Sequence, residues 1–176
     1  QVPVRLLKGC RGIAVFPGVI KGAFGVGGRR GHGVVSCRGA HGDWGPPSFM
    51  TLTGGSVGWQ IGIEKADVVL FIMNDKGIRS LLESEFTLGA KGSLAAGPVG
   101  CTVEGDTDLK LDAEIYSYAR SKGLFAGLSL EGARVATDAK AVKAFYGRAV
   151  EPEKILLEGK APRMPAAAKE FVSALP

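Results

Sequence analysis

The stretch GIAVFPGVIKGAFGVGGRRGHGVVSC, residues 12–37, decides the fold because bulky and small side chains alternate along its middle part. Ile20, Phe24 and Val26 share one parity, whereas lysine, alanine and glycine occupy the other. A period of two residues is typical of a β-strand with one bulky and one small face. We therefore expect a strand through these three apolar residues.

The flanks of this strand predict a small antiparallel unit. GIAVF, which ends at Pro17-Gly18, is expected to form a short apolar strand followed by a turn. GVVSC follows a predicted turn at Gly31-His32-Gly33 and is expected to be the hairpin partner. Arg29, Arg30 and His32 would then cluster at the tip of the hairpin.

The same glycines do not fit a phosphate-binding loop. A dinucleotide fingerprint that starts at Gly25 would need a glycine at position 30, where the chain has Arg30, and no helix pattern follows. A P-loop that starts at Gly22 would need lysine and a hydroxyl residue where Gly28 and Arg29 stand. Both nucleotide-binding motifs are excluded.

Strand patterns dominate the first part of the chain, and helix patterns come late. DVVLFIMN (67–74) and IYSYARSKGLFAGLSLEG (115–132) are strand-like, whereas TDAKAVKAFYG (137–147), EPEKILLEG (151–159) and MPAAAKEFVSALP (164–176) have helical caps or periodicity. This order is typical of α+β rather than alternating α/β proteins. We expect an antiparallel, Gly-rich sheet or partly closed barrel with a few helices packed against it.

Local signals place several boundaries within this fold. Asn74 is expected to cap a short helix, and Thr137 to cap a helix that stops at Gly147. Ser121-Lys122-Gly123 offers a hairpin turn between two later strands.

The composition indicates one globular domain, residues 1–176, with 45% hydrophobic residues. Its three cysteines lie far apart and include no C-x-x-C pair, so neither a disulfide framework nor a zinc site is expected. The longest apolar run, Val68 to Met73, is far shorter than the ~20 residues that cross a bilayer. Because the sequence opens at Gln1, a signal peptide, lipid anchor or membrane helix would lie upstream of it.

A hydrolase motif lacks its context. GGSVG, with Ser56 at its centre, matches the G-x-S-x-G elbow, but a strand-like segment follows it where a helix is required. The histidine of such a triad comes later in the chain, whereas His32 and His41 come earlier. We expect no enzyme; a deep polar cavity around any of these three residues would favour an enzyme or small-ligand pocket instead.

The acidic segment EGDTDLKLD, residues 104–112, is also a poor metal site. Lys110 occupies what would be the third ligand of a calcium loop, and no glycine follows it. No metal and no cofactor are predicted.

Positive charge is concentrated at the N-terminal end. Before the first acidic residue, Asp43, the chain has seven cations: Arg5, Lys8, Arg11, Lys21, Arg29, Arg30 and Arg38. This asymmetry favours an anionic partner. The alternative is that these residues are solvated positions on different faces. Nucleic acid ranks below a membrane or protein partner because the only aromatics here, Phe16 and Phe24, fall on core positions.

Several sequence blocks, taken together, resemble a known family. They are RGIAVFP (11–17), WGPPSF (44–49), GWQIG (58–62), FTLGA (86–90), AAGPVG (95–100), IYSYARSKGLFAGLSLEG (115–132) and FYG (145–147). In this order they look like a SYLF domain, the lipid-binding module also named for yeast actin-patch proteins. The resemblance covers about residues 2–147 and leaves 148–176 as a C-terminal helical extension.

The resemblance implies a non-enzymatic module that binds phosphoinositides and other anionic lipids and, in fungal and animal members, actin filaments. Basic surface and an N-terminal amphipathic segment would make these contacts. Two departures affect the lipid mode. Only the end of the usual first helix, Val2 to Lys8, is visible, and Cys101 stands where a basic residue is common.

Our main hypothesis is therefore an anionic-lipid surface made by basic residues. The predicted lipid-binding residues are Lys8, Arg11, Lys21, Arg29, Arg30, Arg38, Arg120 and Lys122. The competing hypothesis is a protein-interaction scaffold, with actin as partner in a eukaryote and an envelope partner in a bacterium.

Composition favours a bacterial source, because the chain has a single asparagine, two glutamines and abundant alanine, glycine and arginine. Similar bacterial proteins are often periplasmic or envelope proteins, some of them lipoproteins. A periplasmic location peripheral to the membrane would make phosphatidylglycerol or cardiolipin the lipid. In a eukaryote we would expect a cytoplasmic protein.

Overall fold

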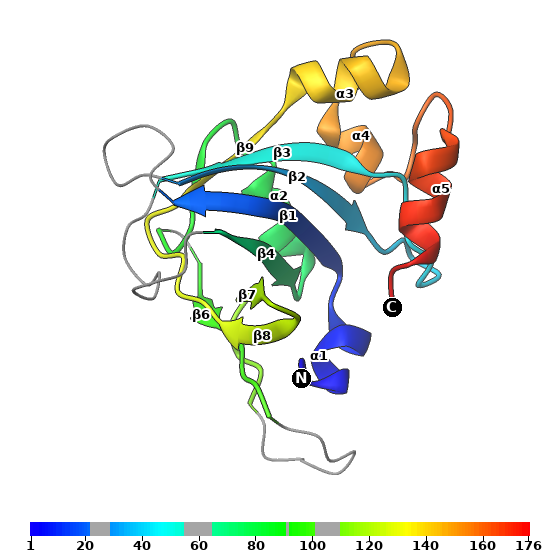
Figure 1. Ribbon diagram of the computed structural model, residues 1–176. Helices are drawn as coiled ribbons and strands as arrows, with labels where there is room; N and C mark the ends of the chain where they lie inside the picture. The colour runs from blue at the N-terminus through cyan, green and yellow to red at the C-terminus, as the bar shows by residue number, and fades with distance from the viewer. Residues whose placement is uncertain (22–28, 55–64, 91, 101–109) are drawn as a thin grey trace.

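A single curled sheet forms the body of the protein (Figure 1). The computed structural model describes residues 1–21, 29–54, 65–90, 92–100 and 110–176. The strands in these residues are β1 (Gly12–Lys21), β2 (Arg29–Cys37), β3 (Ser48–Thr53), β4 (Lys65–Ile72), β5 (Phe86–Thr87), β6 (Leu94–Ala96), β7 (Ile115–Ser121), β8 (Leu124–Gly127) and β9 (Arg134–Thr137).

The strand order is β5-β9-β3-β2-β1-β4-β7-β6. β6 pairs with the first half of β7, and β8 pairs with its second half. The pairs are antiparallel except for β6 with β7, which is parallel. The α+β class and the antiparallel, partly closed sheet predicted from the sequence are confirmed.

Five short helices in the described residues accompany the sheet. They are α1 (Val4–Gly9), α2 (Asp75–Leu81), α3 (Ala139–Tyr146), α4 (Pro152–Leu156) and α5 (Ala166–Ser173). Figure 1 shows α1 and α5 on the same side of the sheet as the two chain ends. Among the described residues, none of the helices has the length and apolar character needed to cross a membrane.

The sheet has two faces with different roles. Phe16, Val35 and Leu70 lie on the face that packs against α2, α3 and α4 in the larger hydrophobic cluster, and we call it the core face. Val15 and Val69 lie on the opposite face, which we call the outer face. A smaller cluster that includes Leu6 of α1 covers part of this outer face.

Close packing inside the sheet requires the glycines of β2. A Cβ atom at Gly33 would lie 2.4 Å from Cδ1 of Phe16, and one at Gly31 would lie 2.6 Å from Cγ2 of Val19. Phe16 and Val19 are fully buried, so their side chains rest directly on the glycine backbone.

The predicted turn at Gly31-His32-Gly33 is therefore wrong, because this tripeptide lies inside β2 and its glycines make room for β1 side chains. Arg30 and His32 are strand residues and not the tip of a hairpin. The strand predicted through Phe24 and Val26 lies outside the described residues.

The predicted end of the first strand at Pro17-Gly18 is also wrong, because β1 continues to Lys21. The register of β1 shifts here against both β2 and β4, which is the geometry of a β-bulge. Pro17 has no N–H to lose, and Gly18 adopts φ +62° while its N–H donates to Oδ1 of Asp67 at 2.9 Å. The strand bends instead of ending.

Most local boundary predictions agree with the structure. Asn74 caps α2, since its Oδ1 accepts the N–H of Gly77 at 2.8 Å. Gly147 ends α3 with φ +79°. Lys122 and Gly123 both have positive φ and form the two-residue turn between β7 and β8. The cap of α3 was predicted one residue early, because Asp138 rather than Thr137 accepts the N–H of Ala141.

Candidate functional site

Three exposed cations from distant parts of the chain lie in one row across the outer face. Arg30 of β2 is directly opposite Thr53 of β3, which is directly opposite Arg134 of β9. On the other side, Arg30 is opposite Ile20 of β1, which is opposite Lys65 of β4. Directly opposed residues of neighbouring strands point to the same face. We call Arg30, Lys65 and Arg134 the cation row.

The cation row is wide and solvent-accessible. All three of its side chains are exposed, and Ile20 between them is 48% exposed. Four strand spacings separate β9 from β4, so the row extends over about 19 Å. This width suits a large partner surface rather than a single small ligand.

A shallow depression of about 600 Å³ adjoins the row between the outer face and the start of α3. Arg30, His32, Thr51, Asp138 and Lys140 contribute to its lining. Both oxygens of the Asp138 carboxylate are engaged, one by the N–H of Ala141 at 3.0 Å and the other by Nδ1 of His32 at 3.5 Å. Arg30 and Lys140 give the rest of the depression a basic character.

The hairpin between β7 and β8 carries two of the predicted residues. Arg120 is directly opposite Asp67 of β4, and its guanidinium lies 5.8 Å from the ring centre of Phe125. Lys122 is exposed in the turn, and Leu124 beside it is 76% exposed. Leu124 is therefore an exposed apolar side chain on a hairpin that also carries two cations.

The remaining predicted residues do not join these groups. Lys8, Arg11 and Arg38 lie near the start of β1, about 30 Å along that strand from Lys21. Arg11 pairs with Asp75 at 3.1 Å. Lys21 and Arg29 pair through their backbones at the ends of β1 and β2, and their side chains lie outside the described part of the chain. The eight residues therefore do not share one patch.

Arg38 has a structural position. Its guanidinium donates to the carbonyl oxygens of Leu7, Lys8 and Pro176 at 3.1, 3.0 and 2.9 Å. It also lies over the ring of Trp44, 4.6 Å from the ring centre. The guanidinium thus links the end of α1 to the segment that follows α5.

Sequence reasoning missed Lys65 and Arg134. Both belong to the part of the chain where positive and negative charge nearly balance, so no linear signal marks them. Their alignment with Arg30 depends on pairings between strands far apart in sequence. Only the register of the assembled sheet brings them together.

No reaction centre emerges from the described residues. Among them, no group of three or more His, Cys, Asp and Glu side chains could hold a metal ion. His41 is exposed in a turn, His32 lines only the shallow depression, and Ser56 lies outside the described residues. Cys10 and Cys37 are free and buried, and burial raises the pKa of the Cys37 thiol to about 12. A thiol with this pKa remains protonated and unreactive near neutral pH.

The fold and surface define an α+β domain with a curled, mainly antiparallel sheet and a row of three exposed cations across its outer face. Residues 53–176 match the Ysc84 family, described as "Las17-binding protein actin regulator", and the chain belongs to this family. The resemblance to the SYLF domain is thereby confirmed. The family is described by actin regulation and not by an enzymatic activity.

Curated relatives support this assignment. SH3 domain-containing YSC84-like protein 1 of Xenopus laevis is 36% identical over 148 residues, which are 84% of this chain and 44% of the relative. The Homo sapiens protein of the same name is 34% identical over 175 residues, 99% of this chain and 50% of the relative. Protein YSC84 of Saccharomyces cerevisiae is 34% identical over 169 residues, 94% of this chain and 36% of the relative.

The chain thus spans about half or less of the length of these relatives. The bacterial source, the envelope location and the domain boundary after Gly147 remain predictions.

Proposed function

We propose that this domain acts without a catalytic step and binds actin filaments through the cation row and the adjoining depression. The alignment of Arg30, Lys65 and Arg134 on one exposed face carries this proposal. The description of the family as actin regulators supports the choice of partner. An acidic partner surface would complement the charge of this face.

The proposed contact is mainly electrostatic. Exposed charge pairs contribute about 0.2–1 kcal/mol each, so three cations together contribute about 0.6–3 kcal/mol. Charges of this kind act mainly on the association rate and on the salt dependence of binding. The contact is expected to weaken as the ionic strength rises, because salt screens exposed charges.

A charge-matched pair of variants tests the proposal by co-sedimentation with actin filaments. The triple variant Arg30→Ala, Lys65→Ala and Arg134→Ala is expected to bind about tenfold more weakly than the unmodified domain at low salt. The difference should shrink at high salt, because the lost interactions are electrostatic.

The control variant removes three exposed cations from the helical part of the chain: Lys143→Ala, Arg163→Ala and Lys169→Ala. It changes the net charge by the same amount and should bind like the unmodified domain. Equal binding by both variants, or equal loss in both, would contradict a role for the cation row.

An anionic membrane surface is the second candidate, and the β7–β8 hairpin favours it. Leu124 is 76% exposed close to Lys122, and Arg120 lies on the same hairpin. An exposed apolar side chain can enter the interfacial region of a bilayer while neighbouring cations bind anionic headgroups. The family resemblance that implies lipid binding also supports this candidate.

Sedimentation with liposomes that do or do not contain phosphatidylglycerol tests this second function. The variant Arg120→Gln, Lys122→Gln and Leu124→Ser is expected to lose more than about tenfold in affinity, since each cation near an anionic surface contributes about 1 kcal/mol. Arg148→Gln, Arg163→Gln and Leu157→Ser form the matched control. The hairpin is excluded as the lipid contact if binding does not depend on phosphatidylglycerol, or if the hairpin substitutions leave binding unchanged.

A further inference from the structure

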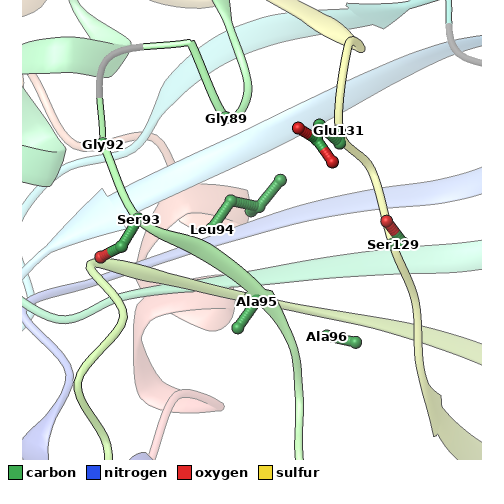
Figure 2. Close-up of a pocket in the computed structure, with 8 residues that line it drawn as sticks. All are labelled: Gly89, Gly92, Ser93, Leu94, Ala95, Ala96, Ser129 and Glu131. Atoms are coloured by element: carbon green, nitrogen blue, oxygen red, sulfur yellow. The ribbon is translucent and has the colours of Figure 1, made fainter.

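A small pocket lies beside β6, at one end of the curled sheet. One wall is β6, the last strand of the sheet order, together with the segment before it. The facing wall is the connection from β8 to β9, which contains Ser129 and Glu131. Figure 2 shows these two segments facing each other, with the side chains of Leu94 and Glu131 between them. The pocket encloses about 200 Å³.

β6 forms one wall of this pocket, and none of the described strands pairs with the edge of β6 that faces away from β7. On its paired side, the carbonyl of Ser93 accepts from Ile115 at 3.2 Å and the N–H of Gly97 donates to Ser117 at 2.9 Å. Along a strand, the backbone groups of successive residues point to opposite sides. The N–H and C=O groups of Leu94 and Ala96 therefore point away from β7, as at an unpaired sheet edge.

Glu131 gives the pocket its charge. Among the lining residues that the structure describes, it is the only acidic one, and none of them is a cation. None of the described residues forms an ion pair with its carboxylate. Gly89, with φ +87°, packs against its stem, and a Cβ atom there would lie 3.0 Å from Cγ of Glu131. This close approach holds the base of the Glu131 side chain beside the pocket.

The other lining residues keep the pocket narrow and accessible. Gly92, Ala95 and Ala96 have small side chains or none. The volume is below the about 300–1,000 Å³ typical of small-molecule sites. A pocket of this size suits a single long side chain better than a complete metabolite.

We propose that this pocket receives one lysine or arginine side chain of an extended peptide, which pairs as an added strand with the edge of β6 that faces away from β7. The backbone groups of Leu94 and Ala96 form the main-chain hydrogen bonds, and Glu131 binds the cationic head. Strand addition of this kind draws its affinity from the backbone and its specificity from side-chain pockets. The site shares no residue with the cation row and selects a partner of the opposite charge.

Amide chemical shifts of the whole chain test this inference with three acetylated and amidated pentapeptides. The probe is Val-Ala-Lys-Ala-Val, one control has norleucine in place of lysine, and a second has proline in place of both alanines. The lysine peptide is expected to cause saturable shifts at Leu94, Ala96, Ser129 and Glu131. The norleucine peptide lacks the charge, and the proline peptide lacks the two backbone donors at the alanine positions and cannot lie as a regular paired strand, so both should bind about tenfold more weakly.

Two substitutions complete the test. Glu131→Gln should reduce the affinity for the lysine peptide to that for the norleucine peptide, whereas Glu153→Gln, an exposed change on α4, should leave it unchanged. The inference is overturned if the lysine peptide causes no saturable shift by about 10 mM. Equal affinity of the lysine and norleucine peptides would also overturn it.

Discussion

Replacing Gly33 by alanine is expected to lower the free energy of unfolding by about 3 kcal/mol. The new Cβ atom would lie 2.4 and 2.6 Å from Cδ1 and Cε1 of Phe16 and 2.7 Å from the carbonyl oxygen of Val15. The Phe16 ring is fully buried and the Val15 carbonyl belongs to the paired backbone of β1, so neither group can shift without disturbing its neighbours. Urea denaturation followed by circular dichroism measures the loss.

Gly39→Ala is the matched control for this prediction. A Cβ atom at Gly39 would have its nearest neighbour at 3.7 Å, which is an ordinary contact, so the change should alter stability by less than about 0.5 kcal/mol. In the double variant Gly33→Ala and Phe16→Ala the two losses should not add, because the alanine at 16 removes the ring that clashes. Similar stability of the Gly33 and Gly39 variants would contradict the packing of β1 on β2.

Local chemistry explains which parts of the fold could be predicted from the sequence. The cap at Asn74, the stop at Gly147 and the turn at Lys122-Gly123 depend on neighbouring residues, and the structure has them in place. Gly31 and Gly33 look like turn residues by the same local criteria. Their actual role depends on Phe16 and Val19 of the adjacent strand, which no local pattern reveals.

The candidate site was less predictable for the same reason. Counting charges along the chain identified Arg30 but placed it with Lys8, Arg11 and Arg38, which lie near the opposite end of β1. Its true neighbours in the row come from β4 and β9 and align through a register set by the assembled sheet. The concentration of positive charge near the N-terminus therefore predicted that this domain has a basic surface, but it did not predict which residues form that surface.

Arg38 illustrates how a basic residue can serve the fold. Its three hydrogen bonds end on carbonyls of Leu7, Lys8 and Pro176, so one guanidinium joins Lys8 to a residue 168 positions further along the chain. Trp44 reinforces this connection, because its Nε1 donates to the same Pro176 oxygen at 2.6 Å. Leu175 packs against the hydrophobic cluster that contains Leu6 of α1. Arg38 thus contributes to the contacts both of α1 and of the chain after α5.

Replacing Arg38 by methionine is therefore expected to cost about 3 kcal/mol of stability, because hydrogen bonds from a charged donor contribute about 1.5–3 kcal/mol and several carbonyls lose their partner together. Amide hydrogen exchange should show which elements lose stability, with faster exchange in α1 and α5 and little change in β4.

Arg11→Met is the control: its partner Asp75 is exposed, so the loss of stability should stay below about 1 kcal/mol. Arg38→Lys keeps the charge but cannot reach three carbonyls with the same planar geometry, so it should restore only part of the stability. Full restoration by lysine would show that charge alone holds these segments, whereas unchanged exchange in α1 and α5 would contradict the link through Arg38.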